Sequence, residues 1–273
     1  MLRRRLLIIA FLLPLWIYVI FLGEMALTIV MMGALTIGAW EYRNIFRLGG
    51  YKPTEFTLIA ATLGFTALRN WFGFDWDQVF LVVLVLSSMV VHLVAYEKGR
   101  EQAGIDFLIT VGGIVYIGLF GSYFVALRSL PEGEWWLLVV LVAVWLADTG
   151  GYVIGKNLGR NKLAHRLSPK KTREGYLGGI VLGTLLTPLF VLLFRQLGLS
   201  LESEITLSRA LVIGIIMSIF TTLGDLGISM FKRSFNVKDS GTILPGHGGI
   251  LDRIDSWLWG VLIGYYIITL FII

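Results

Sequence analysis

The sequence predicts an all-α integral membrane protein that crosses the bilayer several times. Three observations predict this class: 56% of the 273 residues are hydrophobic, only 15% are charged, and the mean hydropathy is +0.80. Soluble globular domains are less apolar and more highly charged. The apolar residues also come in blocks of about twenty, which is the length of helix that crosses about 30 Å of hydrocarbon.

Nine such blocks follow one another along the chain. They cover residues 6–22, 25–40, 57–71, 78–96, 108–127, 135–154, 177–194, 210–230 and 255–273. The first block follows three arginines, as a signal peptide would, but it is long and no small-residue cleavage pattern follows it. We therefore interpret it as a retained span. The third block is interrupted by Arg69 and is followed by an aromatic group typical of a membrane interface.

The basic residues predict how the helices are oriented, because lysine and arginine concentrate in cytoplasmic loops. If the N-terminus is cytoplasmic, all 23 basic residues fall on the cytoplasmic side except Arg69, Arg128, Arg195 and Arg209. A miscounted span would scramble this asymmetry. The formal charge of +5 therefore indicates a cytoplasmic face that attracts lipid headgroups or nucleotide phosphates, and we expect no nucleic-acid partner.

The chain is expected to form a single membrane domain, residues 1–273, whose halves differ. Residues 1–134 supply N-terminal helices with short loops, whereas residues 135–273 hold the long basic loops, the dense glycines and most of the acids inside apolar blocks. We expect the catalytic helices and cytoplasmic loops in the second half. The chain has no cysteine, which excludes disulfides, thiolate metal sites and cysteine nucleophiles.

Four aspartates are candidates for a cation site. Asp148 and Asp225 lie inside apolar blocks, where an ionisable group costs roughly 2.5–3.5 kcal/mol on insertion scales. Asp252 and Asp255 open the last block. Each could be structural, either paired with a basic residue or placed at a helix N-terminus. Because all four are expected in one layer near the cytoplasmic side, we predict a metal site, and carboxylate oxygens suit magnesium.

The segment before the last block, KRSFNVKDSGTILPGHGGILDRID at 232–255, is a candidate phosphate cradle. Gly248 and Gly249 permit close approach of a ligand to the backbone, just before a helix N-terminus that attracts anions. His247, between glycines, is the histidine that we assign to the site, as a phosphate donor or leaving-group contact. The flanking basic residues expected to bind phosphate are Lys232, Arg233, Lys238 and Arg253.

A second basic loop, RLSPKKTREGYLGG at 166–179, follows the sixth block. Lys170, Lys171 and Arg173 are expected to bind a lipid phosphate or a triphosphate. For Lys156, Arg160, Lys162 and Arg166 we prefer the simpler interpretation that basic residues gather on the cytoplasmic side of any membrane protein. The role of Glu174 stays open, and we interpret His92 as a hydrogen-bonding residue between helices.

These segments resemble a known family. The stretch SMFKRSFNVKDSGTILPGHGGILDRID, from Ser229 to Asp255, is similar to the signature of the phosphatidate cytidylyltransferases, and SPKKTREG at 168–175 resembles that family's second motif. The resemblance implies CTP and phosphatidic acid as substrates, CDP-diacylglycerol and pyrophosphate as products, and dependence on Mg²⁺, with a second cation as an open alternative.

On this basis each candidate residue receives an expected role. The catalytic residues are Asp225, Asp252, Lys232 and His247. The metal ligands are Asp148, Asp225, Asp252 and Asp255. The substrate-binding residues are Lys170, Lys171, Arg173, Arg233, Lys238, Gly248, Gly249 and Arg253.

Two alternative functions stay open. A CTP-dependent lipid kinase of the polyprenol type uses the same nucleotide but transfers its γ-phosphate, and the DRID ending of the signature argues against it. A cation transporter would explain acids inside spans, yet it would not need a glycine-histidine cradle. The expected partners are CTP, phosphatidic acid and the lipid bilayer, with a homodimer left open. By analogy we expect the chain in a bacterial inner membrane, with its active site facing the cytoplasm.

Overall fold

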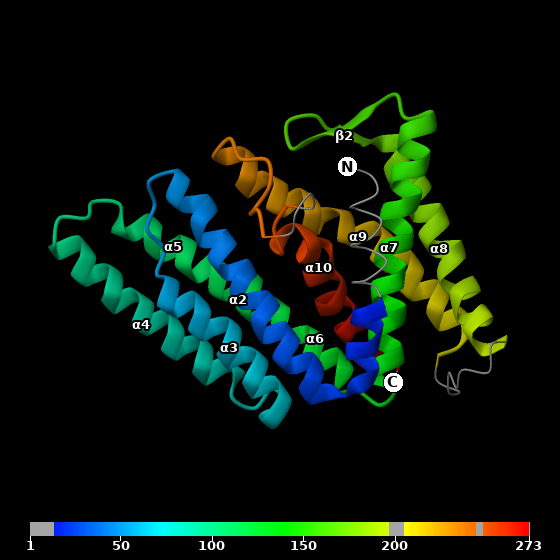
Figure 1. Ribbon diagram of the computed structural model, residues 1–273, viewed down its shortest axis with the longest axis horizontal. Helices are drawn as coiled ribbons and strands as arrows, with labels where there is room; N and C mark the ends of the chain where they lie inside the picture. Colours follow the sequence, from blue (N-terminus) through cyan, green and yellow to red (C-terminus); the bar gives the residue numbers. More distant parts are fainter. Residues whose placement is uncertain (1–13, 197–204, 244–247, 273) are drawn as a thin grey trace. The chain divides into compact units, whose positions relative to one another are not determined.

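The structure is a computed structural model that describes residues 14–196, 205–243 and 248–272. It is almost entirely helical (Figure 1). The helices are α2 (Glu24–Leu48), α3 (Glu55–Phe72), α4 (Asp77–Glu97), α5 (Ala103–Gly113), the π-helix η1 (Ile114–Leu119), α6 (Phe120–Arg128), α7 (Gly133–Leu158), α8 (Arg173–Gln196), α9 (Leu207–Ser234), α10 (Leu251–Ile267) and the π-helix η2 (Ile268–Ile272). Two short strands, β1 (Lys162–Ala164) and β2 (Ser168–Thr172), pair antiparallel between α7 and α8.

Seven helical segments of the described chain are long and apolar enough to cross a membrane. They are Glu24–Leu48, Asp77–Glu97, Ala103–Arg128, Gly133–Leu158, Arg173–Gln196, Leu207–Ser234 and Leu251–Ile272. They coincide with seven of the nine predicted blocks and confirm the all-α polytopic class. The first block is described only from residue 14, and residues 14–22 are helical. The third block forms α3, which is not among the seven. The number of nine spans and the cytoplasmic N-terminus stay predictions.

Helix α3 accommodates the arginine that interrupts its apolar block. Arg69 is 3% exposed. Its guanidinium donates to Asp77 Oδ2 at 2.5 Å and to the Gly73 carbonyl at 2.9 Å, and it lies 3.5 Å from the centre of the Phe74 ring. Pairing matters here because a buried charge without a partner is strongly destabilising.

The described chain divides into two compact units, and we describe each by itself. Unit 1 comprises Met1–Ser129 and Phe231–Ile254, and unit 2 comprises Leu130–Met230 and Asp255–Ile273. Helices α9 and α10 therefore contribute residues to both units. Of the residues predicted to form the site, those from Lys232 to Arg253 belong to unit 1 and the others to unit 2.

In unit 1, an aromatic cluster anchors the end of α9 against α2. The ring of Phe231 lies 5.7 Å from that of Tyr42, and the ring of Phe235 lies 5.2 Å from that of Phe46. Such tilted and edge-on pairs contribute packing energy beyond the area that they bury. The signature segment that follows Phe235 is thereby tied to α2 at its start.

In unit 2, α7 and α8 pack closely along a seam of small residues. A Cβ atom on Gly175 would lie 2.7 Å from the Gly151 carbonyl oxygen, and one on Gly179 would lie 2.7 Å from the Ala147 carbonyl oxygen. Ala147, Gly151 and Gly175, Gly179 are each spaced by four residues, the spacing that lets two membrane helices bring their backbones together. The seam fixes the two helices that carry the loop between them.

That loop is a β-hairpin, which the sequence did not predict. Its strands pair Lys162 with Thr172 and Ala164 with Ser168, so the SPKKT part of the second motif is strand β2. Neither strand has the apolar alternation that identifies a half-buried strand. A side chain helps to hold the base of the hairpin instead: Glu174 accepts hydrogen bonds from the backbone N–H groups of Arg160 and Asn161, both at 3.1 Å.

Candidate functional site

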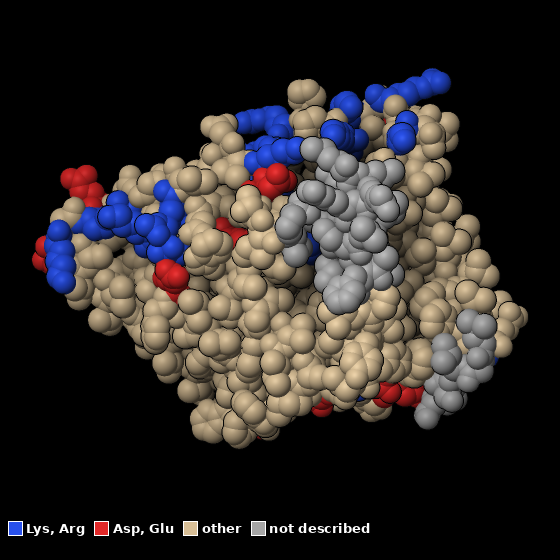
Figure 2. Space-filling view, in the orientation of Figure 1, with Lys and Arg blue, Asp and Glu red and all other residues tan. Residues whose placement is uncertain are grey.

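Unit 2 contains a cavity of about 600 Å³. It is lined by α7, the hairpin, α8 and α9, and four lysines contribute to its wall: Lys156, Lys162, Lys170 and Lys171. Figure 2 shows Lys and Arg side chains gathered over the end of unit 2 that carries β2. The polar part of the wall also includes Asp148, Ser168 and Thr172. A cavity with this lining is suited to a polyanion.

Lys171 is held among carboxylates. Its Nζ lies 2.6 Å from Asp225 Oδ2, and the charges of Asp148 and Asp255 also act on it. Burial of the Lys171 ammonium lowers its pKa, but the three carboxylates together outweigh burial and leave the pKa raised. Lys171 is therefore a fixed positive charge at neutral pH. Its side chain stays 27% exposed, so the ammonium remains accessible from the cavity.

Three features place these groups. The α7–α8 seam packs Ala147, the residue before Asp148 in α7, against Gly179 of α8. Thr172 ends β2, and its Oγ1 accepts a hydrogen bond from the Gly175 N–H at 3.1 Å, which caps the first turn of α8. In α9, Gly224 lets the backbone of α10 approach, because a Cβ there would lie 2.5 Å from the Asp255 carbonyl oxygen. Close packing of helices and the Thr172 cap therefore hold the backbone segments that carry these groups.

The acids of unit 2 have the chemistry of a magnesium site. Asp148, Asp225 and Asp255 supply hard oxygen donors, and the Lys171 ammonium, which is paired with Asp225, offsets part of their charge. Within the described ranges, no group of three His, Cys, Asp or Glu side chains converges as metal ligands. The Lys171–Asp225 pair is the structural alternative that the sequence left open for an acid inside an apolar block, and the metal ion and its ligand set stay predictions.

Asp252, the fourth predicted metal ligand, is in unit 1 and has protein donors on both oxygens. Lys232 Nζ donates to Oδ1 at 2.6 Å, and the N–H groups of Ser240 and Gly249 donate to Oδ2 at 2.8 and 3.1 Å. Gly248 has φ +81°, and a Cβ there would lie 2.6 Å from Asp252 Oδ2. In this arrangement, Asp252 fixes the fold of the signature segment. The predicted catalytic and metal roles of Asp252 and Lys232 stay untested.

Glu41 of α2 was not predicted as a site residue. It is fully buried, and its carboxylate accepts hydrogen bonds from the Ser240 hydroxyl at 2.8 Å and from the N–H groups of Ile250 and Leu251 at 3.0 and 2.8 Å. These amides open α10 and had been expected to attract a substrate phosphate. A protein carboxylate caps them instead. The available signal was an acid directly after an apolar block, in GAWEY, but its partners lie 199 to 210 residues further along the chain.

The remaining predicted residues fall in different places. Lys170 and Lys171 line the cavity of unit 2, whereas Arg173 is exposed and does not line it. Lys156 and Lys162, which we had attributed to the general basic face, do line it. The other basic residues predicted to bind phosphate, Arg233, Lys238 and Arg253, are exposed in unit 1. His247 lies outside the described residues.

Comparisons with known proteins agree on one family. A model of the cytidylyltransferase family matches residues 3–271. The chain is 40% identical over 194 residues to the phosphatidate cytidylyltransferase of Bacillus subtilis, covering 71% of this chain and 67% of that protein. It is 39% identical over 186 residues to the phosphatidate cytidylyltransferase of Staphylococcus haemolyticus, covering 68% of each.

A third relative is more similar over a shorter stretch. It is the phosphatidate cytidylyltransferase of Staphylococcus saprophyticus, which is 44% identical over 177 residues, covering 65% of this chain and 64% of that protein. The matches therefore span about two thirds of these relatives.

Proposed function

The chain belongs to the cytidylyltransferase family, and from this premise we propose that it transfers the cytidylyl group of CTP to phosphatidate. The products are CDP-diacylglycerol and pyrophosphate. One observation in the structure carries the proposal furthest: a cavity in unit 2 is lined by four lysines and Asp148, and one of these lysines, Lys171, is paired with Asp225. Lysines bind phosphates, and carboxylates bind the metal ion that accompanies a nucleoside triphosphate.

The reaction requires little covalent participation by the protein. A phosphate oxygen of phosphatidate attacks the α-phosphorus of CTP and forms a new P–O bond, while the bond from the α-phosphorus to the β-phosphate oxygen breaks. Pyrophosphate departs with that electron pair. Because a phosphomonoester has a second pKa of about 6, the attacking oxygen is already largely ionised at neutral pH, and no strong general base is needed. Positioning and neutralisation of charge supply the catalysis.

The lysines of the cavity wall are well suited to that neutralisation. Lys171 stays protonated because three carboxylates act on its ammonium. Lys156, Lys162 and Lys170 add positive charge around the same cavity. These groups hold the triphosphate and the lipid phosphate, whose mutual repulsion would otherwise oppose the attack.

Asp148, Asp225 and Asp255 would hold Mg²⁺, which would neutralise further phosphate charge. A second cation, and the metal role of Asp252, belong to the same proposal. In unit 1, Lys232, Arg233, Lys238 and Arg253 are proposed phosphate contacts, with Gly248 and Gly249 in the segment that presents them. His247 is proposed as a leaving-group contact.

The setting of the reaction is proposed on similar grounds. The chain is an integral membrane protein. The concentration of basic residues on one predicted side supports an active site that faces the cytoplasm. The bacterial relatives support a bacterial membrane, and the inner membrane is proposed by analogy. A homodimer stays an open part of the proposal.

The test is which phosphorus of CTP enters the lipid. Purified protein is incubated with Mg²⁺, phosphatidate and CTP labelled at either the α- or the γ-phosphorus, and the organic phase is counted. We expect the α label in lipid and the γ label in aqueous pyrophosphate. A lipid kinase would give the reverse pattern, and a cation transporter would label no lipid, so either outcome would overturn the proposal.

A further inference from the structure

Unit 1 has a cavity of its own, of about 280 Å³, that the proposed reaction does not use. It lies where α4 ends and the chain turns into α5. Its polar lining comes from three separate stretches of unit 1: Lys52 and Thr54 before α3, His92 and Lys98 at the end of α4, and Arg100 and Asp106 at the turn into α5. None of these residues belongs to the candidate site.

The lining carries more positive than negative charge. Arg100 is neutralised by Asp106, with Nε 2.8 Å from Oδ2, and its Nη2 also donates to the Gly50 carbonyl at 2.7 Å. Asp106 accepts the Lys52 backbone N–H at 2.7 Å as well, which holds the Lys52 backbone at the cavity. Within the described ranges, no ion pair is recorded for the ammonium groups of Lys52 and Lys98. Two positive charges therefore remain uncompensated at the cavity.

The inner wall of the cavity is polar. His92 is 4% exposed, and its Nδ1 donates to the Ser88 carbonyl at 2.8 Å. Its Nε2 lies 3.4 Å from the Thr54 hydroxyl. The Thr54 backbone N–H donates to Thr110 Oγ1 at 3.0 Å. These bonds fix a preformed wall, as a binding site requires.

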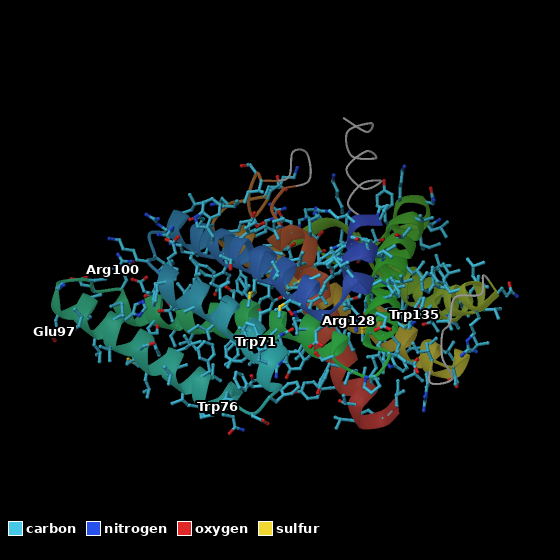
Figure 3. All side chains as sticks on the ribbon, turned by 60° about the horizontal axis from the view of Figure 1, so that its bottom comes forward. Trp71, Trp76, Glu97, Arg100, Arg128 and Trp135 are labelled. Carbon is cyan, nitrogen blue, oxygen red and sulfur yellow. The ribbon has the colours of Figure 1, made fainter. Side chains whose placement is uncertain are left out.

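Below the lysines, α4 presents apolar side chains to its surroundings. Val83, Val90, Val91 and Val94 are 55, 59, 46 and 48% exposed. Of the seven candidate spans, α4 is the least covered by the rest of the protein, with 17% of its apolar window buried. Figure 3 shows Glu97 and Arg100 at the end of α4 opposite Trp76. An exposed apolar stripe thus leads to a cationic cavity at one end of the helix.

We propose that this cavity binds the phosphate group of an anionic phospholipid, with the acyl chains lying along the exposed face of α4. The tendency of lysine and arginine to concentrate in cytoplasmic loops explains a basic loop. That tendency does not explain why two lysines without ion pairs line the same preformed cavity. A free phosphate offers the same charge. The apolar stripe favours the lipid, because it gives the acyl chains a surface that continues to the headgroup site.

A thiol placed in the cavity tests this directly, since the chain has no cysteine of its own. Ala95 lines the cavity, and Glu97 is exposed on the same helix without lining it. The full-length Ala95→Cys and Glu97→Cys variants are reconstituted in phosphatidylcholine nanodiscs with or without phosphatidylglycerol, and the rate of reaction with a maleimide is measured. We expect phosphatidylglycerol to slow labelling at position 95 and to leave position 97 unchanged.

The lysines supply the second comparison. In the Ala95→Cys background, Lys52→Gln with Lys98→Gln should raise the phosphatidylglycerol content needed for half protection roughly thirtyfold, or about fivefold per lysine. Arg47→Gln is the matched control, because Arg47 is exposed in the same unit but does not line the cavity, and it should leave protection unchanged.

Three outcomes would overturn the proposal: equal labelling rates with and without phosphatidylglycerol, protection at both positions, or protection that survives the double lysine change. Inorganic phosphate in phosphatidylcholine nanodiscs separates the two sources. Protection by phosphatidylglycerol, with or without protection by inorganic phosphate, supports the lipid site. Protection by inorganic phosphate alone would show a free-anion site and overturn the lipid assignment.

Discussion

Lys171 supplies the charge that keeps three acids of unit 2 from repelling one another. Its raised pKa determines how this stabilisation depends on pH. A lysine whose pKa is higher in the folded state stabilises that state fully below its ordinary value, about 10.5, and loses the contribution only as the pH rises through the raised value. The Lys171 contribution is therefore constant across the neutral range.

The first prediction is that Lys171→Gln destabilises the protein, whereas Lys170→Gln does not. Lys171 is paired with Asp225, but Lys170 is exposed and has no ion pair recorded within the described residues. Removing Lys171 leaves three carboxylates without their counter-charge, at a cost of about 2 kcal/mol after allowance for partial exposure. The thermal midpoint in detergent without added magnesium measures it. Equal thermal midpoints for the two variants would contradict the role of Lys171 as the counter-charge to these carboxylates.

Single residues also show where the sequence was sufficient and where it was not. Asp148 and Asp225 were predictable, because a charge inside an apolar block is rare and costly. Lys156 and Lys162 were not, since the charge rule for cytoplasmic loops explains a lysine near any span and does not distinguish the lysines that reach a cavity. Glu41 could not be predicted, because its partners at Ser240, Ile250 and Leu251 are distant in sequence and local patterns do not report such contacts.

At the level of elements, the start of α10 depends on that distant acid. The opening amides of a helix need acceptors, and the Glu41 carboxylate accepts hydrogen bonds from two of them. The same carboxylate also accepts a hydrogen bond from the Ser240 hydroxyl. The sequence predicted a last apolar block over 255–273, and α10 begins four residues earlier, at Leu251. The sequence could not show that a residue of α2 would occupy the position expected for a phosphate. Residues close together in sequence were enough to predict the helix. Whether its first N–H groups are free to bind a ligand depends on Glu41, which is distant in sequence.

The second prediction concerns this cap. Glu41→Ala removes three hydrogen bonds from a fully buried carboxylate and should lower the free energy of unfolding by about 3 kcal/mol. Glu41→Gln keeps one acceptor oxygen and the side-chain shape, so it should cost about half as much. Thermal unfolding of the two variants beside the parent chain provides the measurement. If the alanine variant were as stable as the glutamine variant, the capping role would be wrong.

The third prediction concerns the α7–α8 seam. Gly179→Leu forces a side chain against the Ala147 carbonyl, so the helices must separate, and we expect a loss of about 2 kcal/mol together with the activity that depends on the cavity between them. Leu177→Ala is the control, because Leu177 is 61% exposed on the same helix. It should retain both the midpoint and the turnover. Retention of activity by Gly179→Leu would show that the cavity does not need the close seam.

Across the whole molecule, the distribution of basic residues predicts the orientation of the helices, and a few arginines depart from it. Arg69, Arg195 and Arg209 are such arginines, and each lies apart from the basic loops of its own unit. In unit 2, Arg195 donates to the Ile205 carbonyl and Arg209 to the Ile272 carbonyl, at the helix ends opposite the hairpin. In unit 1, Arg69 pairs with Asp77, at the opposite end of α4 from Lys98. Each unit by itself is consistent with the predicted orientation.

The fourth prediction tests that orientation with single cysteines at exposed positions. His165→Cys and Glu97→Cys are predicted on the cytoplasmic side, and Asp75→Cys and Ser208→Cys on the outer side. An impermeant maleimide added to intact cells should label only the latter two, and all four should react after the membrane is permeabilised. If position 165 or 97 were labelled in intact cells, the predicted orientation of the unit that contains it would be wrong.

The α7–hairpin–α8 segment also bears on how the chain enters the bilayer during synthesis. An aspartate inside an apolar helix opposes insertion of that helix alone. Here the compensating ammonium, Lys171, follows in the very next loop, and the glycine seam lets the two helices pair without waiting for other partners. The nascent chain therefore has the means to neutralise Asp148 within one helical hairpin, before α9 and its Asp225 have been translated.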